Sequence, residues 1–496
     1  MNISILWFKK DLRIIDHKPL HKALGYGKIL PIYIYEPEIL DSEDYDSRHH
    51  QFINDSILSV NKQLEKLGGY LHVEYGSATK VFQKLKSKLG NPIKIFSHEE
   101  TGNWISYQRD IQLKKWCDNE KIDWHEFPQN GVQRPIKNRN GWSYEWNKSM
   151  NKPVLSIPAK IDFHHFENKL NIIEVSELKK SNTHNEIQKG GSENAYKLLS
   201  SFLNERGKNY SKEMSSPLTA FTSCSRLSPY ITFGNISIKE IYQISKEKRD
   251  SLKGVKNVGN WRSSISSFLG RLRWHCHFIQ KLEDQPSIEW KNMSSSYDNI
   301  RDNDFNKEYF EAWVKGLTGY PLIDACMRCL RSTGYINFRM RAMLVSFASY
   351  DLWLDWRITS KYLATQFLDY EPGIHYSQFQ MQSGVTGINS IRIYSPVKQQ
   401  KDHDPEGVFV RKWVPELKKV PLDYIFSPHL MSEGFQKLHS CKIGEDYPEP
   451  IVDHNLQVKK AKKILYGIKS TQQAKTEARQ VYLKHGSRRK TKRKRQ

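Results

Sequence analysis

The first 130 residues alternate short apolar runs with longer stretches of mixed polarity. Five runs rich in Ile, Val, Tyr and Phe predict strands at residues 3–8, 29–35, 70–75, 93–97 and 122–127. Runs that are almost continuously apolar are typical of parallel strands buried on both faces. The stretches between them, such as residues 49–67 and 81–89, repeat apolar positions with a helical period. The pattern therefore predicts an α/β domain with a doubly wound parallel sheet.

Beyond residue 195 the period of the apolar positions becomes helical. Long segments at 261–282, 320–330, 339–356 and 361–368 predict helices, and strand-like runs are few. Between the two regions, Asn, Lys, His and Ser are frequent and little periodicity remains. We therefore expect four parts: an α/β domain (1–130), a linker (131–195), a mostly α-helical domain (196–480) and a basic disordered tail (481–496).

The net charge points to a class of partner. The chain has 77 Lys and Arg against 54 Asp and Glu, a formal net charge of +23. Eight of the cations lie between residues 484 and 495, and without them the remaining chain still has a net charge of +15. A protein this basic is expected to bind a polyanion. The tail fits either nonspecific contact with phosphates or a nuclear localisation signal.

Other features exclude several protein classes. No apolar run approaches the ~18 residues of a membrane-spanning helix. The apolar run at residues 3–8 is shorter than the roughly 7–15 residues of a signal-peptide core. Six cysteines in 496 residues exclude a disulfide scaffold. We expect a monomer with reduced thiols in a bacterial-type cytoplasm, or in a nucleus if the source is eukaryotic.

Six motifs follow one another between residues 7 and 396. They read WFKKDLRIID (7–16), SRLSPYI (225–231), WVKGLTGYPLIDA (313–325), RMR (339–341), LDWR (354–357) and IRIYSP (391–396). In this order and at these separations they resemble the DNA photolyase/cryptochrome family. The resemblance runs from residue 3 to about residue 417.

The resemblance implies an N-terminal α/β antenna domain and a C-terminal helical domain that holds a folded FAD. In the family, light excites reduced FAD, which donates an electron to a pyrimidine dimer in a flipped-out site; the dimer splits and the electron returns. UV-damaged DNA is then the expected partner and a deoxyribodipyrimidine photolyase-like lyase the expected enzyme. Cryptochromes use the same pocket for blue-light sensing, so a photoreceptor without repair activity is the alternative.

The phosphate end of the FAD is expected at a turn bracketed by Ser225 and Ser228. Hydroxyl and backbone N–H groups at a helix N-terminus suit anions, although a simple helix cap is the alternative reading. Cys224 stands where the family usually has Thr. The resemblance implies further cofactor contacts at Tyr210, Arg226, Leu227 and His275.

The ring end of the FAD is expected at Arg341 and Asp369, which match the family's Arg–Asp pair beside the flavin. A cation there stabilises the anionic reduced flavin, and the carboxylate orients the guanidinium group; a purely structural ion pair is the alternative. Glu371 takes a position that is usually Asp.

His375 matches the position that faces flavin N5, which is Asn in most repair enzymes of the family. An imidazole, with an ordinary pKa of ~6.5, can give or take a proton there. Alternatively, the ring bonds to backbone and leaves the flavin unaffected.

The family's relay of three tryptophans is incomplete. Trp356 matches the middle position, whereas the flavin-proximal position is Phe379 and the surface position is about Asn303. Tyr350, Trp353 and Trp356 are spaced i, i+3, i+6 in a segment predicted as one helix, where such residues neighbour one another. They form an alternative electron relay, or else plain core.

The substrate side also departs from the family. Trp274 matches a tryptophan on which the lesion stacks, and such stacking contributes ~1–3 kcal/mol per base. Met381 stands where the family usually has a second, partner tryptophan. Arg271, one helical turn before Trp274, stands where many relatives have an acidic residue. The lesion is therefore left open between a cyclobutane dimer, a six-four photoproduct and none.

Two further segments have residue types that could bind an antenna ligand or a metal. Residues 98–104 follow the fourth predicted strand, where open α/β sheets bind ligands; the resemblance suggests a pterin or deazaflavin antenna there, with an empty site as the alternative. Cys326 and Cys329 are interpreted as core residues rather than metal ligands, because a zinc site needs four ligands. With Cys441 alone near the C-terminus, the family's four-cysteine iron–sulfur subgroup is excluded.

Overall fold

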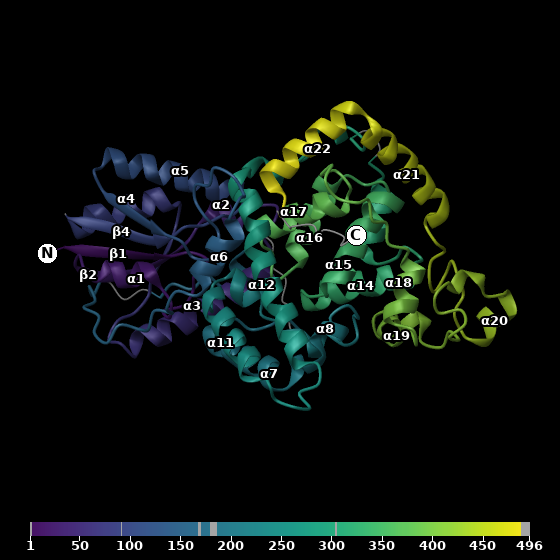
Figure 1. The fold of residues 1–496 in the computed structure, drawn as a ribbon, viewed down its shortest axis with the longest axis horizontal. Coiled ribbons are helices and arrows are strands. Elements are labelled where there is room, and N and C mark those ends of the chain that lie inside the picture. Colours follow the sequence, from purple (N-terminus) through teal and green to yellow (C-terminus); the bar gives the residue numbers. More distant parts are fainter. Residues whose placement is uncertain (1, 91, 167–169, 179–185, 303–304, 488–496) are drawn as a thin grey trace.

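Five parallel strands form the sheet of the N-terminal domain, in the order β3–β2–β1–β4–β5. They span Ile3–Phe8 (β1), Lys28–Tyr35 (β2), His72–Tyr75 (β3), Ile93–His98 (β4) and Asp123–Phe127 (β5). This computed structural model describes residues 2–90, 92–166, 170–178, 186–302 and 305–487. The predicted doubly wound sheet is confirmed, and every strand ends within two residues of its predicted bounds (Figure 1).

Alternate side chains of each strand face two different helical layers. Ile5 and Trp7 pack toward α4 (Ala78–Leu89) and α5 (Trp104–Asn119). Leu6 and Phe8 pack toward α1 (Lys18–Ala23) and α3 (Ser47–Glu65). A short helix, α2 (Pro37–Leu40), follows β2. The direction of winding reverses between β1 and β4, so the carboxyl ends of these strands form the crevice where open sheets bind ligands.

The expected linker is more ordered than its composition suggests. It contains helix α6 (Trp142–Met150), whose Trp142 and Trp146 are buried in a core shared by both domains. The Trp142 indole N–H donates to Oε1 of Gln280 at 2.9 Å. The expectation of an irregular segment was wrong here, because a few large apolar side chains spaced four apart are enough to dock a short helix.

The second domain is helical, as predicted, and its long helix α12 packs between α11 and α17 on the side toward the α/β domain (Figure 1). Its helices are α7 (Ser192–Asn204), α8 (Tyr210–Glu213), α9 (Ala220–Ser223), α10 (Ser228–Thr232), α11 (Ile238–Ser251), α12 (Trp261–Asp284), α13 (Lys307–Lys315), α14 (Pro321–Thr333), α15 (Phe338–Ser346), α16 (Trp356–Gln366), α17 (Pro372–Gln382), α18 (Pro396–His403), α19 (Val408–Trp413), α20 (Glu433–Leu438), α21 (His454–Ser470) and α22 (Gln472–His485).

The single helix predicted at 339–356 is wrong. Helix α15 passes into a π-helical turn at Phe347–Asp351, and Trp353 then adopts a left-handed backbone with φ of 55°. A new helix, α16, begins at Trp356, where the Asp355 carboxylate accepts the backbone N–H of Arg357 at 2.7 Å. The N-cap at Asp355 therefore overrides the apolar periodicity across this junction.

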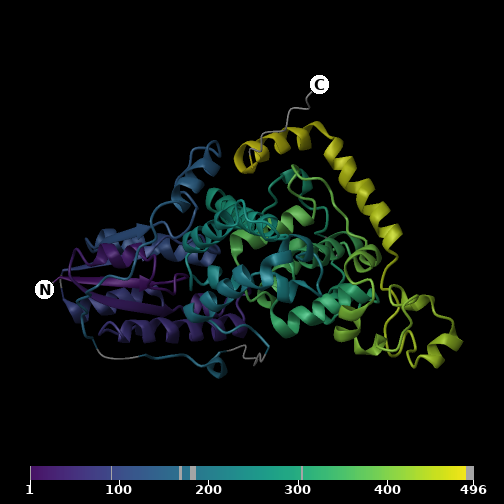
Figure 2. The same ribbon diagram turned by 60° about the horizontal axis from the view of Figure 1, so that its bottom comes forward.

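The C-terminal helices α21 and α22 lie along the outside of the helical domain in both views (Figures 1 and 2). The tail predicted from 481 begins later, because residues 481–485 complete α22 with Val481 and His485 buried. Residues 488–495, which hold most of the basic run, lie outside the described residues. Among the helices that the structure does describe, none combines the length and apolarity needed to cross a bilayer.

Candidate functional site

A cavity of about 400 Å³ opens in the helical domain between α12, α15, α17 and the turn before α10. It brings together most of the residues predicted from sequence: Tyr210, Cys224, Ser225, Arg226, Ser228, Arg271, Trp274, His275, Arg341, Asp369, Glu371 and His375. Leu227 does not line it; that side chain is buried in the core beneath the turn. Residues up to 165 positions apart thus converge on one site.

An ion pair joins α15 to the segment before α17 in the wall of this cavity. Nη1 and Nη2 of Arg341 donate to the two carboxylate oxygens of Asp369 at 2.9 and 3.0 Å. Burial alone would raise the pKa of Asp369, but the guanidinium group and the Ser228 hydroxyl outweigh burial and lower it. The Asp369 carboxyl group is therefore ionised at neutral pH.

We expected the serine turn at the opposite end of the cavity from this ion pair, but the turn lies beside the pair. Ser228 is near enough to Asp369 to lower the pKa of that carboxyl group, and the hydroxyl of Thr232, in the helix that Ser228 begins, donates to the Asp369 backbone carbonyl at 3.5 Å. The two predicted anchor points therefore lie close together in one wall, which suits a folded ligand.

Ser225 and Ser228 do not act as a simple helix cap. The N-cap of α10 is Leu227, and no side chain caps this helix. Arg226 has a left-handed backbone, with φ of 61°. Its guanidinium group lies 3.7 Å from the centre of the Tyr335 ring and bonds Oε1 of Gln188 at 2.9 Å. The turn thus holds a cation against the cavity wall.

His375 and Glu371 place two titratable groups along the cavity. Nε2 of His375 donates to the backbone carbonyl of Ser360 at 2.8 Å, which leaves Nδ1 as an acceptor. Burial lowers the pKa of His375 to about 4, so the ring is neutral at pH 7. Burial raises the pKa of Glu371 to about 7. His375 thus makes the hydrogen bond to backbone that was one of the two alternatives, and it does so through Nε2, so Nδ1 is not used by this bond.

Several polar atoms of the lining have no partner within the described chain. They are both ring nitrogens of His275, Oδ1 of Asn337, Nε of Arg339 and Oε1 of Gln378. Unpaired buried polar groups are costly and rare, so the cavity fits a ligand with many hydrogen-bonding groups, such as FAD. Of these residues, only His275 was predicted. Arg339 could have been found, since it lies two residues before Arg341 in the same motif.

The rim of the cavity carries the predicted substrate residues, with one exception. Trp274 is half-buried and stacks on Phe278 with ring centres 5.6 Å apart. Arg271 is exposed; its Nη2 donates to Sδ of Met214 at 3.9 Å, and its guanidinium group lies 5.4 Å from the centre of the Phe338 ring. Met381 is absent from the lining, because Gln378 and Gln382 occupy the cavity face of α17. Met381 therefore does not contribute to the cavity as described, and its predicted substrate role stays a prediction.

The predicted stripe of Tyr350, Trp353 and Trp356 is broken by the turn between α15 and α16. Arg301 lies 4.5 Å from the Trp353 ring centre, and Trp353 donates to the backbone of Ile300. Trp356 instead contacts Tyr376, with ring centres 6.5 Å apart. Phe379, at the flavin-proximal relay position, lines the cavity; Asn303 lies outside the described residues.

A second, smaller pocket of about 100 Å³ lies at the carboxyl ends of β1, β2 and β4. Of the predicted antenna segment, Glu100 and Asn103 line it. Arg109 bonds carboxylate oxygens of Glu36 and Glu100 at 2.8 and 2.7 Å. Tyr370 lines both this pocket and the larger cavity, and thus forms part of the wall between them.

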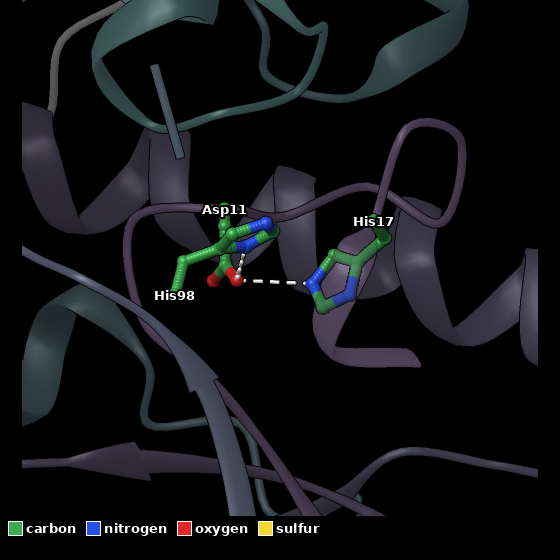
Figure 3. A group of neighbouring side chains, drawn as sticks. All are labelled: Asp11, His17 and His98. Carbon is green, nitrogen blue, oxygen red and sulfur yellow. Dashed lines mark hydrogen bonds and ion pairs between the residues drawn. The ribbon is translucent and has the colours of Figure 1, made fainter. Parts of the chain in front are cut away.

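Asp11, His17 and His98 form a buried cluster at the switch point of the sheet (Figure 3). One oxygen of Asp11 lies 2.9 Å from Nε2 of His17 and 2.7 Å from Nδ1 of His98. Nδ1 of His17 accepts a hydrogen bond from the backbone N–H of Leu20. In the neutral ring, Nε2 of His17 is therefore protonated and donates a hydrogen bond to Asp11. In this arrangement the three side chains form a buried hydrogen-bonded cluster centred on the Asp11 carboxylate.

Cys326 and Cys329 lie in α14 and are fully buried in the hydrophobic core. Burial raises the pKa of Cys329 to about 12, so this thiol stays protonated. Sγ of Cys329 contacts the hydroxyl of Thr333 and the backbone of Tyr335. Their surroundings match the predicted role as core residues.

Two family models match the chain: "DNA photolyase" at residues 4–154 and "FAD binding domain of DNA photolyase" at residues 268–466. The chain is 27% identical to a deoxyribodipyrimidine photo-lyase of Alkalihalophilus pseudofirmus, over 93% of this chain and 97% of that protein. It is also 27% identical to a cryptochrome DASH of Synechocystis, with the same coverage. An archaeal photolyase structure from Sulfolobus tokodaii, with two FAD molecules, is 27% identical and matches with a TM-score of 0.75, over 94% of this chain and 100% of that chain.

Proposed function

Because this chain belongs to the DNA photolyase and cryptochrome family, whose helical domain binds FAD, we propose that it repairs pyrimidine dimers in DNA by light-driven electron transfer. The observation that carries the proposal is the layout of the cavity. A part-buried Arg341–Asp369 pair and unpartnered polar groups line its interior, while Trp274 and Arg271 stand at its rim. Such a cavity suits a flavin inside and a base-sized ligand at the opening.

Each set of residues has its own task in this proposal. Arg341 would hold the electron-rich edge of the flavin ring, because a fixed cation stabilises negative charge there. His275 and Arg226 would bind polar groups of the cofactor, and the neutral His375 offers Nδ1 as an acceptor. Bound FAD supplies an electron on excitation. Trp274 provides the stacking surface for a flipped-out lesion, and Arg271 can donate to a base carbonyl.

The small pocket of the α/β domain fits a light-harvesting role. The Sulfolobus tokodaii photolyase is described with a second FAD that implies a novel light-harvesting cofactor. We propose that an aromatic antenna of the pterin or deazaflavin class binds between Tyr33, Tyr35 and Arg109. Its binding there would place it across the Tyr370 wall from the flavin cavity.

A blue-light receptor of the cryptochrome type is the second candidate. Arg271 replaces the acid that bonds the lesion in many repair enzymes, and Met381 lies away from the cavity lining. His375 replaces the usual Asn beside the flavin. These departures favour altered chemistry near the bases.

One assay separates the two functions. The flavin-loaded protein is reduced, mixed with UV-irradiated oligothymidylate and illuminated with blue light. Recovery of the ultraviolet absorbance of thymine supports repair, and Trp274→Ala should slow it. No recovery in a protein with a full complement of reduced flavin would contradict repair and favour sensing.

A further inference from the structure

The C-terminal arm, which we define as helices α21 and α22 with residues 454–487, concentrates positive charge on the outside of the molecule. It contains eight Lys and Arg and a single carboxylate, Glu477. The family model of the FAD-binding domain ends at residue 466, so all of α22 lies beyond it. Both views show the arm along the outer edge of the helical domain (Figures 1 and 2).

Both helices of the arm divide into an apolar inner face and a basic outer face. In α21, Ala461 and Leu465 are buried against the core. In α22, Ala474 and Val481 are buried. The exposed cations occupy the other faces: Lys459, Lys460, Lys462, Lys463, Lys475, Arg479 and Lys484. Tyr466 and Tyr482 are 50% and 46% exposed and lie among them.

The single carboxylate of the arm is directed inward. Glu477 accepts hydrogen bonds from the hydroxyls of Ser294 and Ser295 at 2.7 and 2.8 Å and from the backbone N–H of Ser296 at 2.8 Å. Although partial burial opposes ionisation, these bonds lower the pKa of Glu477 to about 2. Its charge thus anchors the arm instead of neutralising the outer face.

Two further contacts fix the ends of the arm. His454 bonds the buried carboxylate of Asp351 at the start of α21. Nε2 of His485 lies 3.0 Å from Oε1 of Gln285, at the end of α12. Gln285 is eleven residues beyond Trp274, or about 16 Å along the helix at ~1.5 Å per residue. The arm is therefore tied to the helix that carries the stacking tryptophan.

None of the seven exposed cations forms an ion pair with another described residue of the chain. Unpaired Lys and Arg in this number favour a polyanion, and exposed tyrosines among them are typical of nucleic-acid surfaces. We propose that the outer face of the arm binds backbone phosphates of double-stranded DNA outside the lesion. This inference deepens the proposed function by naming a surface for its substrate.

The salt dependence of DNA binding tests the arm directly. Lys459→Gln, Lys462→Gln, Lys463→Gln and Lys475→Gln are combined in one full-length variant. Binding to a fluorescent duplex, undamaged or UV-irradiated, is measured in the dark over a range of salt concentrations. The slope of log K against log salt is negative, and each lost phosphate contact reduces its magnitude by about 1. We therefore expect the magnitude of the slope to decrease by about 3–4 on both duplexes.

A matched control removes four exposed lysines from the α/β domain: Lys62, Lys66, Lys80 and Lys115, each changed to Gln. It has the same change in net charge and should lose less than about 1 in slope. Flavin content and melting temperature show that both variants are folded. An unchanged slope in the arm variant, or an equal decrease in the control, would overturn the proposal. Failure of dimer repair would not, since the test uses no light.

Discussion

Two groups of polar side chains, one in each domain, contrast in how they are satisfied. In the α/β domain, Asp11 receives N–H groups from His17 and His98, and its second oxygen accepts the backbone N–H of Lys9. In the helical domain, neither ring nitrogen of His275 has a partner among the described residues, and neither does the side-chain carbonyl of Gln378. The first group is complete within the chain, whereas the second is not.

This difference distinguishes a structural cluster from a binding site. A buried polar group left without a partner costs about 1–3 kcal/mol, so a fold retains it where a ligand supplies the missing bonds. Asp11, His17 and His98 have the residue types of a metal site, yet each of the two imidazoles already has a hydrogen-bond partner in the Asp11 carboxylate. The cavity residues resemble a metal site less in sequence, but more of their polar atoms lack hydrogen-bond partners that a ligand could supply.

The largest effect should follow from breaking the complete cluster. Asp11→Ala leaves two buried imidazole N–H groups unpaired, at about 1–3 kcal/mol each. We expect the free energy of unfolding, measured with urea, to fall by about 2–6 kcal/mol. A chelator should leave the wild type unchanged. Destabilisation of the wild type by the chelator would show instead that the cluster holds a metal.

The pH dependence of stability tests the environment of His375. The folded protein keeps this ring neutral down to a pKa of about 4, whereas the unfolded chain binds the proton below about pH 6.5. The free energy of unfolding should therefore decrease as the pH falls from 6.5 to 4, by about 3 kcal/mol at most from this residue.

The variant His375→Asn lacks this contribution, and other buried histidines act equally in both proteins. Urea unfolding at pH 7 and pH 4.5 should show a smaller decrease in the variant than in the wild type. Parallel decreases in the two proteins would mean that His375 is not held neutral by its surroundings.

Flavin retention tests the cation in the wall of the same cavity. Arg341→Leu removes the charge that we place beside the flavin ring, so we expect FAD affinity to fall by about 10- to 100-fold, or ~1.4–2.7 kcal/mol. Arg328→Leu breaks the ion pair with Glu416 elsewhere in the domain and is the control. Titration of the unliganded proteins with FAD measures both. Equal losses would assign Arg341 a structural role only.

The smallest expected effects concern the rim. Trp274→Ala should weaken the preference for UV-damaged over undamaged DNA by about 1–3 kcal/mol, the value of one stacked base. Met381→Ala should leave that preference unchanged, because Met381 lies outside the cavity lining. Competition binding in the dark measures both variants. A comparable loss in Met381→Ala would return that residue to the substrate site.

Local patterns were sufficient to predict much of the fold. The five strands and most long helices follow from periodicities within single segments, which depend on neighbours a few residues away. The exceptions occur where one residue dominates. The N-cap at Asp355 splits a predicted helix, and a rotation of about 100° per residue on α17 directs Gln382 and not Met381 into the cavity.

The sequence by itself determined the elements of the fold and the chemical types of the candidate residues, including the Arg341–Asp369 pair. The tertiary structure decided which of these residues are satisfied. Asp11 finds His98 at a distance of 87 positions in the chain, whereas His275 finds no partner among the described residues. Hydrogen-bond satisfaction depends on groups that meet only after the chain has folded, so no periodicity along the sequence can encode it visibly.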